Sequence, residues 1–200
     1  MKKSEISILL GLMLAVAVTF IADTDRQAAQ IRHNTLRLHI IAQDDSTLNQ
    51  HIKTQIQLAV EKLWPSMYCN AASYEQAVEI TQSNLEYIKQ VTDNALKNLD
   101  AGYTSQCNLE EFYFDTTTYG DLTLPRGKYT ALTIKLGDAT GKNWWCIVYP
   151  RIRCGIGGEY EADNNNTLFE TDNFRIKLKI VEWRQDIKQY FASDPEYSNL

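Results

Sequence analysis

Two adjacent tryptophans in the stretch "NWWCIVYP", residues 143–150, constrain the fold of this chain more than any other feature. The run is rich in aromatic and β-branched residues, which predicts a strand. Adjacent side chains of a strand point to opposite faces of the sheet, so Trp144 and Trp145 cannot share one core. Alternation places Trp144 with Cys146 and Val148, and Trp145 with the bulkier residues 147 and 149. We therefore predict Trp145 in the core between sheet and helices and Trp144 on the open face.

The first 35 residues have the layout of an export signal followed by a polar stretch. Lys2 and Lys3 precede an uncharged apolar run over residues 6–22, and two aspartates follow at positions 23 and 25. This order of charges is typical of a segment whose amino end stays in the cytoplasm. Residues 15–17 offer an A-x-A cleavage site, so residues 1–22 are predicted to be a signal peptide or a membrane anchor. The polar residues 23–35 are predicted to form a tether.

The remaining sequence predicts an α+β domain, with a small antiparallel β-sheet, two long helices packed on one face and a C-terminal helix. We expect a strand at 36–42, a helix capped by Ser46 and ended by Pro65, and a second helix opened by the capping box of Ser73 and Gln76. Gly102 is its natural stop. Strands at 128–136 and 144–149 are expected to pair as a hairpin.

The C-terminal residues carry two periodicities at once. Residues 173–179 alternate as a strand, whereas apolar positions from 176 to 191 follow helical spacing. Helix propensity after residue 180 favours mostly helix, with a strand at its front as the alternative. Residues 36–192 are taken as the domain and residues 193–200 as a tail.

Composition and motifs argue against two broad functions. The formal net charge is −5 and basic residues are scattered, without the basic stripe of a nucleic-acid-binding protein. Nothing predicts a metal, a cofactor or a catalytic residue, because none of the common catalytic motifs occurs. A thiol nucleophile made of Cys146 and His39 is conceivable, but a structural cysteine and a strand histidine are the simpler interpretation. Glu110 and Glu111 are adjacent and diverge on a strand.

Four cysteines stand at positions 69, 107, 146 and 154. Outside the cytoplasm an even count permits disulfides, with three possible pairings. Cys146 and Cys154 are the easiest pair to close, and small buried thiols are the alternative. Zinc is disfavoured because the sequence has no C-x-x-C pair.

Three stretches together resemble the stage II sporulation protein R family: "RLHIIAQDDS" at 37–46, "FYFDTTTYGDLTLPRGKYTAL" at 112–132 and "GKNWWCIVYP" at 141–150. The "KIVEW" stretch at 179–183 is also similar. The resemblance implies a signalling protein made in the forespore and exported into the space between the forespore and mother-cell membranes. There it would trigger a membrane-embedded aspartic protease that removes the pro-sequence from sigma-E. The chain departs from the family at "PRIRC", where Arg151 replaces a second proline.

The partner-binding candidates are then the two tryptophans, because tryptophan is enriched at interface hot spots. Tyr119, Asp121, Lys142 and Asn143 are secondary candidates, expected near the same hairpin end. In an alternative interpretation both indoles are structural. A wall- or carbohydrate-binding module, with an exposed platform of a tryptophan and Tyr129, is the alternative function, and a wall hydrolase is a further one.

Overall fold

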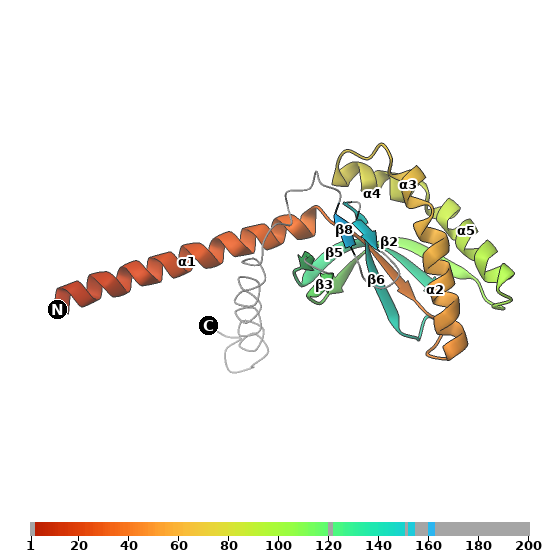
Figure 1. The fold of residues 1–200 in the computed structure, drawn as a ribbon, viewed down its shortest axis with the longest axis horizontal. Coiled ribbons are helices and arrows are strands. Elements are labelled where there is room, and N and C mark those ends of the chain that lie inside the picture. Colours follow the sequence, from red (N-terminus) through yellow and green to blue (C-terminus); the bar gives the residue numbers. More distant parts are fainter. Residues whose placement is uncertain (1–2, 120–121, 151, 155–159, 163–200) are drawn as a thin grey trace, which may run out of the picture. The chain divides into compact units, whose positions relative to one another are not determined.

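The computed structural model describes residues 3–119, 122–150, 152–154 and 160–162, and it confirms an α+β fold (Figure 1). Contacts divide the chain into two compact units. One contains residues 34–114 and 128–166, and the other contains residues 1–33, 115–127 and 167–200. The first unit holds the sheet and its covering helices, and the two units are described separately.

A four-stranded sheet forms the centre of the first unit, with strand order β2-β5-β1-β6. Its strands are β1 (Leu36–Ile41), β2 (Ser105–Phe114), β5 (Gly127–Leu136) and β6 (Asn143–Tyr149). β1 runs parallel to β5 and antiparallel to β6. The sheet is therefore mixed, and the predicted antiparallel sheet with a hairpin of β5 and β6 is wrong. β1 is a central strand of this sheet, and its residues from Leu36 to Ile40 are buried on both faces.

Helices cover one face of this sheet: α2 (Thr47–Glu61), α3 (Trp64–Met67), α4 (Tyr74–Ser83) and α5 (Leu85–Asn98) (Figure 1). Alternate residues of three strands supply the sheet side of the main core, and apolar residues of the helices supply the other side. The sheet contributes Leu36, Leu38, Ile40, Leu132, Ile134, Leu136, Cys146 and Val148, and the helices contribute Ile52, Ile56, Val60, Ala77, Ile88 and Leu96.

The predicted helix starts are confirmed, but the second long helix is divided. Ser46 and Ser73 cap their helices through the backbone N–H groups three residues later. Asn84 closes α4 by donating its backbone N–H and its side-chain amide to the carbonyl of Ile80. Asparagine competes for backbone hydrogen bonds in this way and is a poor helix-interior residue. The break lets α5 turn its own buried face, with Ile88 and Leu96, toward the core.

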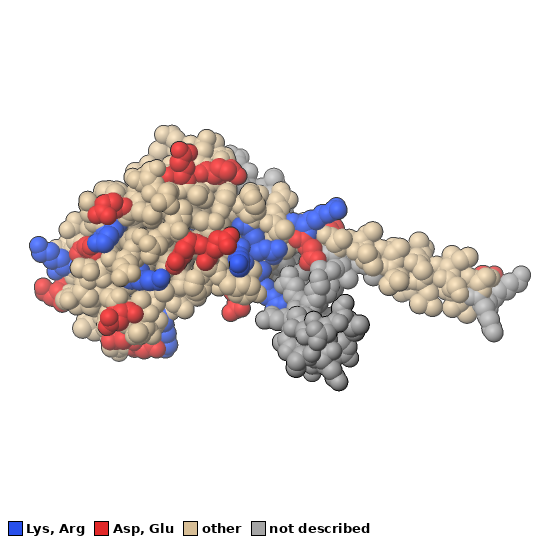
Figure 2. Space-filling model, turned by 180° about the vertical axis from the view of Figure 1, so that it is seen from behind, with Lys and Arg blue, Asp and Glu red and all other residues tan. Residues whose placement is uncertain are grey.

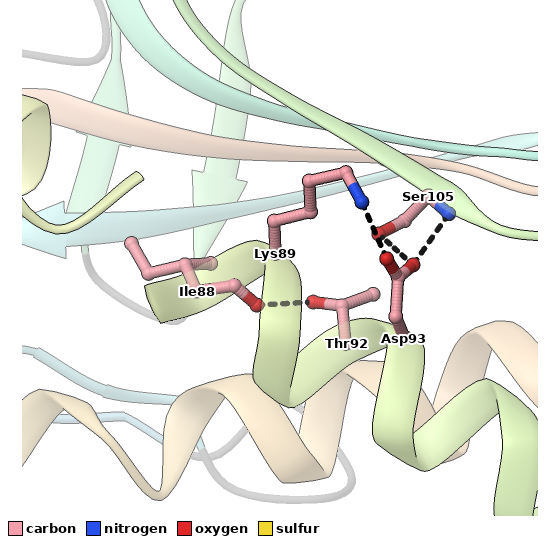
Figure 3. A network of polar contacts seen from close by, with 5 residues as sticks. All are labelled: Ile88, Lys89, Thr92, Asp93 and Ser105. Carbon is pink, nitrogen blue, oxygen red and sulfur yellow. Dashed lines mark hydrogen bonds and ion pairs between the residues drawn. The ribbon is translucent and has the colours of Figure 1, made fainter. Parts of the chain in front are cut away.

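One polar cluster joins α5 to the start of β2 (Figure 3). Asp93 accepts hydrogen bonds from both the backbone N–H and the hydroxyl of Ser105, each at 2.7 Å. Its other oxygen pairs with Lys89 one turn earlier. Burial would raise the pKa of Asp93, but the bonds from Lys89 and Ser105 outweigh it and lower that pKa. The carboxylate therefore anchors the edge strand β2 to the helical layer.

In the second unit, helix α1 (Lys3–His33) includes residues 3–22 of the predicted signal segment and residues 23–33 of the predicted tether. Its large apolar side chains over residues 6–18 are exposed: Ile6, Ile8, Leu9, Leu10, Leu12, Met13, Leu14, Val16 and Val18. Over the part of the chain that the structure describes, no helix reaches the length and apolarity needed to cross a membrane. Residues 115–127 contain the antiparallel pair of β3 (Thr117–Tyr119) and β4 (Leu122–Leu124).

A second short pair of strands follows the four-stranded sheet in sequence. β7 (Ile152–Cys154) pairs antiparallel with β8 (Tyr160–Ala162). The predicted C-terminal helix and the tail at 193–200 lie outside the described residues.

Candidate functional site: the aromatic face of the sheet

The two adjacent tryptophans lie on opposite faces of the sheet, as strand alternation predicts. Trp144 pairs in register with Ile40, and its partly buried indole packs against the core under the helices. Trp145 pairs with His39 and packs on the other face. The prediction that Trp145 lies between sheet and helices is therefore wrong. The helical layer instead covers the face with the smaller side chains, Cys146 and Val148.

The face of the sheet that lacks the helices carries a cluster of rings, which we call the aromatic face. The ring centroids of His39 and Trp145 are 3.9 Å apart with an interplanar angle of 23°, so these rings stack. His39 also lies 4.5 Å from Phe112, and Phe114 meets Trp145 edge-on at 4.7 Å. Tyr129 contacts Phe114 at 5.6 Å. Offset and edge-to-face pairs of this kind add stability beyond their buried area.

Small residues on β5 make this cluster possible. β5 lies between β1 and β2, so the backbones that carry His39 and Phe112 are roughly 10 Å apart at the usual strand spacing. The buried β5 residues between them are Ala131 and Thr133, whose short side chains leave room above the strand. The two rings therefore meet across β5.

A buried arginine completes the aromatic face. Arg37 is 0% exposed, and its guanidinium carbon lies 3.8 Å from the ring centroid of Phe114 and 5.2 Å from that of Tyr129. A guanidinium over aromatic rings is a favourable cation–π arrangement. Positive charge is thus fixed beside the rings.

His39 is held by one of the predicted site residues. Its Nε2 lies 3.0 Å from the Oδ1 of Asn143. Burial, the largest influence, lowers the pKa of His39, although the Asn143 hydrogen bond acts in the opposite direction. The histidine is therefore a neutral member of the aromatic face near pH 7.

The secondary candidates do not form one group. Lys142 is exposed and is fixed through its backbone, which donates to Asp45 and accepts from Lys53. Tyr119 lies in β3 of the other unit, and Asp121 is outside the described residues. Of the six candidates, the structure joins Asn143 to Trp145 through His39.

Two side-chain arrangements considered from the sequence are not formed. Tyr129 is only 1% exposed, so it cannot extend a tryptophan into an open sugar-binding platform. Cys146 faces the helical core and is disulfide-bonded, whereas His39 lies on the aromatic face, so the two cannot form a nucleophile and its base. Glu110 and Glu111 pair with different lysines, Lys135 and Lys128. Among the described residues, no three His, Cys, Asp or Glu side chains are grouped to hold a metal ion.

The cysteines differ in state. Cys69 and Cys107 carry free thiols. Cys146 is disulfide-bonded. The side chain of Cys154 is outside the described residues, so the predicted pair with Cys146 stays a prediction.

Sequence reasoning missed most of the aromatic face. Arg37 and His39 alternate with leucine and isoleucine in "LRLHII", and Phe112 and Phe114 alternate in "FYF". This period of two shows that each set shares a face. It does not show that β1 and β2 lie close enough for the sets to meet.

The fold and the aromatic face define a small α+β domain with a mixed sheet covered by helices on one side. This chain belongs to the Stage II sporulation protein R family, whose sequence model matches residues 32–156 and so includes the whole sheet and helices α2 to α5. It is 31% identical over 127 residues to Stage II sporulation protein R of Bacillus subtilis (strain 168). The match covers 64% of this chain and 57% of that protein. No solved structure gives a significant match.

Proposed function

We propose that this chain is an exported signalling protein of sporulation. In this proposal it activates the membrane-embedded aspartic protease of the mother cell, which then removes the pro-sequence from sigma-E. The family match over residues 32–156 carries the proposal, because it includes the four-stranded sheet and helices α2 to α5 that pack on it. The resemblance to the family supplies the signalling role.

The N-terminal residues support export to the space between the two membranes. Lys2 and Lys3 precede the apolar run in sequence, and the side chains of Ile8, Met13 and Leu14 in α1 are each more than 60% exposed. Such exposed apolar surface is costly in water and suits a lipid or translocon environment. A fusion to a reporter that works only outside the cytoplasm should be active. An inactive reporter on a fusion that accumulates in the cells would contradict the export proposal.

The contact with the protease is proposed at the start of β6. Trp144 is partly exposed on this edge strand, and Lys142 is exposed two residues earlier. A tryptophan offers a large apolar area together with a hydrogen-bond donor, which suits an interface anchor. Figure 2 shows positive and negative side chains interspersed on the face it draws. This pattern favours recognition of the protease through apolar contacts over recognition through net electrostatic attraction.

Deletion of the gene in the host tests the activation step. Cells without this protein should accumulate unprocessed pro-sigma-E during sporulation, and an immunoblot would show it. Complementation with the full chain should restore processing, and a chain without residues 1–22 should accumulate but fail to restore it. Normal processing in the deletion strain would refute the proposed function.

A further inference from the structure

The least expected residue of the sheet is a histidine at the centre of its aromatic face. His39 belongs to the central strand β1 and is 0% exposed. Its ring stacks on the indole of Trp145 and also contacts Phe112, so His39 packs directly against one face of the indole. A titratable ring in such a position couples the packing of Trp145 to the protonation of His39.

The hydrogen bonds of His39 determine where a second proton must bind. The Oδ1 of Asn143 faces Nε2 at 3.0 Å, and since a carboxamide oxygen can only accept, Nε2 carries the hydrogen of the neutral ring. Nδ1 is then the unprotonated nitrogen. Within the part of the chain that the structure describes, Nδ1 is buried and makes no hydrogen bond. Protonation would therefore place a buried N–H without an acceptor, together with a positive charge, which is costly.

The charged groups around His39 mostly add to this cost. Arg37 from β1 and Lys135 from β5 repel a positive imidazolium, and Glu110 from β2 attracts it. Glu110 already pairs with Lys135 at 3.6 Å, which weakens its effect on the histidine. On β6, the facing residues Asn143 and Trp145 carry no charge. Burial is the largest influence and lowers the pKa of His39 from 6.5.

We propose that His39 is an acid-sensitive lock on the aromatic face. The neutral ring holds Trp145 in its stacked position, and a proton at Nδ1 releases the indole. The lock follows from the contacts of these side chains and goes beyond the proposed function. It holds whether or not the protein activates a protease.

The direction of the pH effect follows from the lowered pKa of His39. The unfolded or locally open chain binds the proton more readily than the closed aromatic face. The stabilising contribution of the neutral ring is therefore complete above pH 6.5 and is lost as the pH falls through the pKa of the closed state. The equilibrium constant for opening the aromatic face increases about tenfold for each unit by which the pKa of His39 in the open chain exceeds its pKa in the closed state.

Nuclear magnetic resonance of the full chain in detergent tests the lock. The indole N–H resonance of Trp145, assigned with Trp145→Phe, would be followed from pH 7.5 to pH 5.5 together with the ring protons of His39. We expect His39 to titrate below 6.5 and the Trp145 indole to move toward its unfolded position with the same midpoint. The indole of Trp144, on the other face, should stay in place over this range.

Two substitutions separate the lock from general acid sensitivity. Asn143→Asp places a carboxylate on the Nε2 side and should move the midpoint to higher pH by stabilising the imidazolium. His51→Asn removes an exposed histidine of α2 and should leave the titration unchanged. His39→Gln should abolish the pH dependence of the Trp145 resonance. If His39→Gln does not fold, the His39 titration in the unaltered chain and in Asn143→Asp still decides.

Three results would overturn the proposal. His39 could titrate at or above 6.5, the Trp145 indole could remain in place while His39 titrates, or the indoles of Trp144 and Trp145 could move together. The last result would mean that acid unfolds the whole domain instead of opening one face.

Discussion

Replacing the two tryptophans one at a time tests the assignment of faces. Trp145 contacts the rings of His39, Phe112 and Phe114, and each aromatic pair adds about 0.5–1.5 kcal/mol beyond its buried area. With the lost burial of a partly buried indole, Trp145→Ala should reduce the free energy of unfolding by about 3–4 kcal/mol. Trp144 makes no ring contact among the described residues, and its partial burial is worth about 1–2 kcal/mol.

The assay combines thermal melting with pro-sigma-E processing in sporulating cells. A difference of about 2 kcal/mol should lower the melting temperature of Trp145→Ala some 4–8 °C below that of Trp144→Ala, by the usual relation for a domain of this size. Trp144→Ala should still fold and lose activation. Trp145→Phe is the matched control, because it keeps a ring over His39 and should recover part of the stability. Equal losses for the two alanine variants, or a larger loss for Trp144→Ala, would refute the argument from ring contacts.

Three further predictions concern the anchor of β2 and the cysteines. Asp93→Ala should reduce the free energy of unfolding by about 2 kcal/mol, measured by chemical denaturation, because buried donors of β2 lose their acceptor. In the unaltered protein, the stabilisation by the Asp93 carboxylate should vanish on acidification below the ordinary carboxyl pKa of 3.8. Burial raises the pKa of Cys107 to about 11, so only about one Cys107 thiol in a thousand is ionised at pH 8. Alkylation of Cys107 should therefore be far slower than alkylation of exposed Cys69, and equal rates in a mass-spectrometric time course would contradict this. Non-reduced peptide mapping should show Cys146 linked to Cys154, and reduction should lower the free energy of unfolding by roughly 2–3 kcal/mol; recovery of both as alkylated thiols from freshly isolated protein would exclude the pair.

Local features of the sequence determined where two helices start and which residues of a strand share a face. The hydroxyl of Ser46 and the capping box beginning at Ser73 predicted both helix starts, because capping involves residues three positions apart. Alternation predicted that adjacent tryptophans diverge, since this depends only on the geometry of one strand. The stretches at 37–46, 112–132 and 141–150 together indicated the family, which the comparison confirmed.

Strand order and the composition of the aromatic face depended on the tertiary structure. β5 and β6 are consecutive in sequence, yet β1 lies between them and pairs in parallel with β5. Nothing local distinguishes this arrangement from a hairpin, because the gain comes from burying both faces of β1 at once. The same insertion brings His39 beside Trp145 and, across the small side chains of β5, beside Phe112. These residues are far apart in the chain, and their contact is settled by the packing of the sheet as a whole.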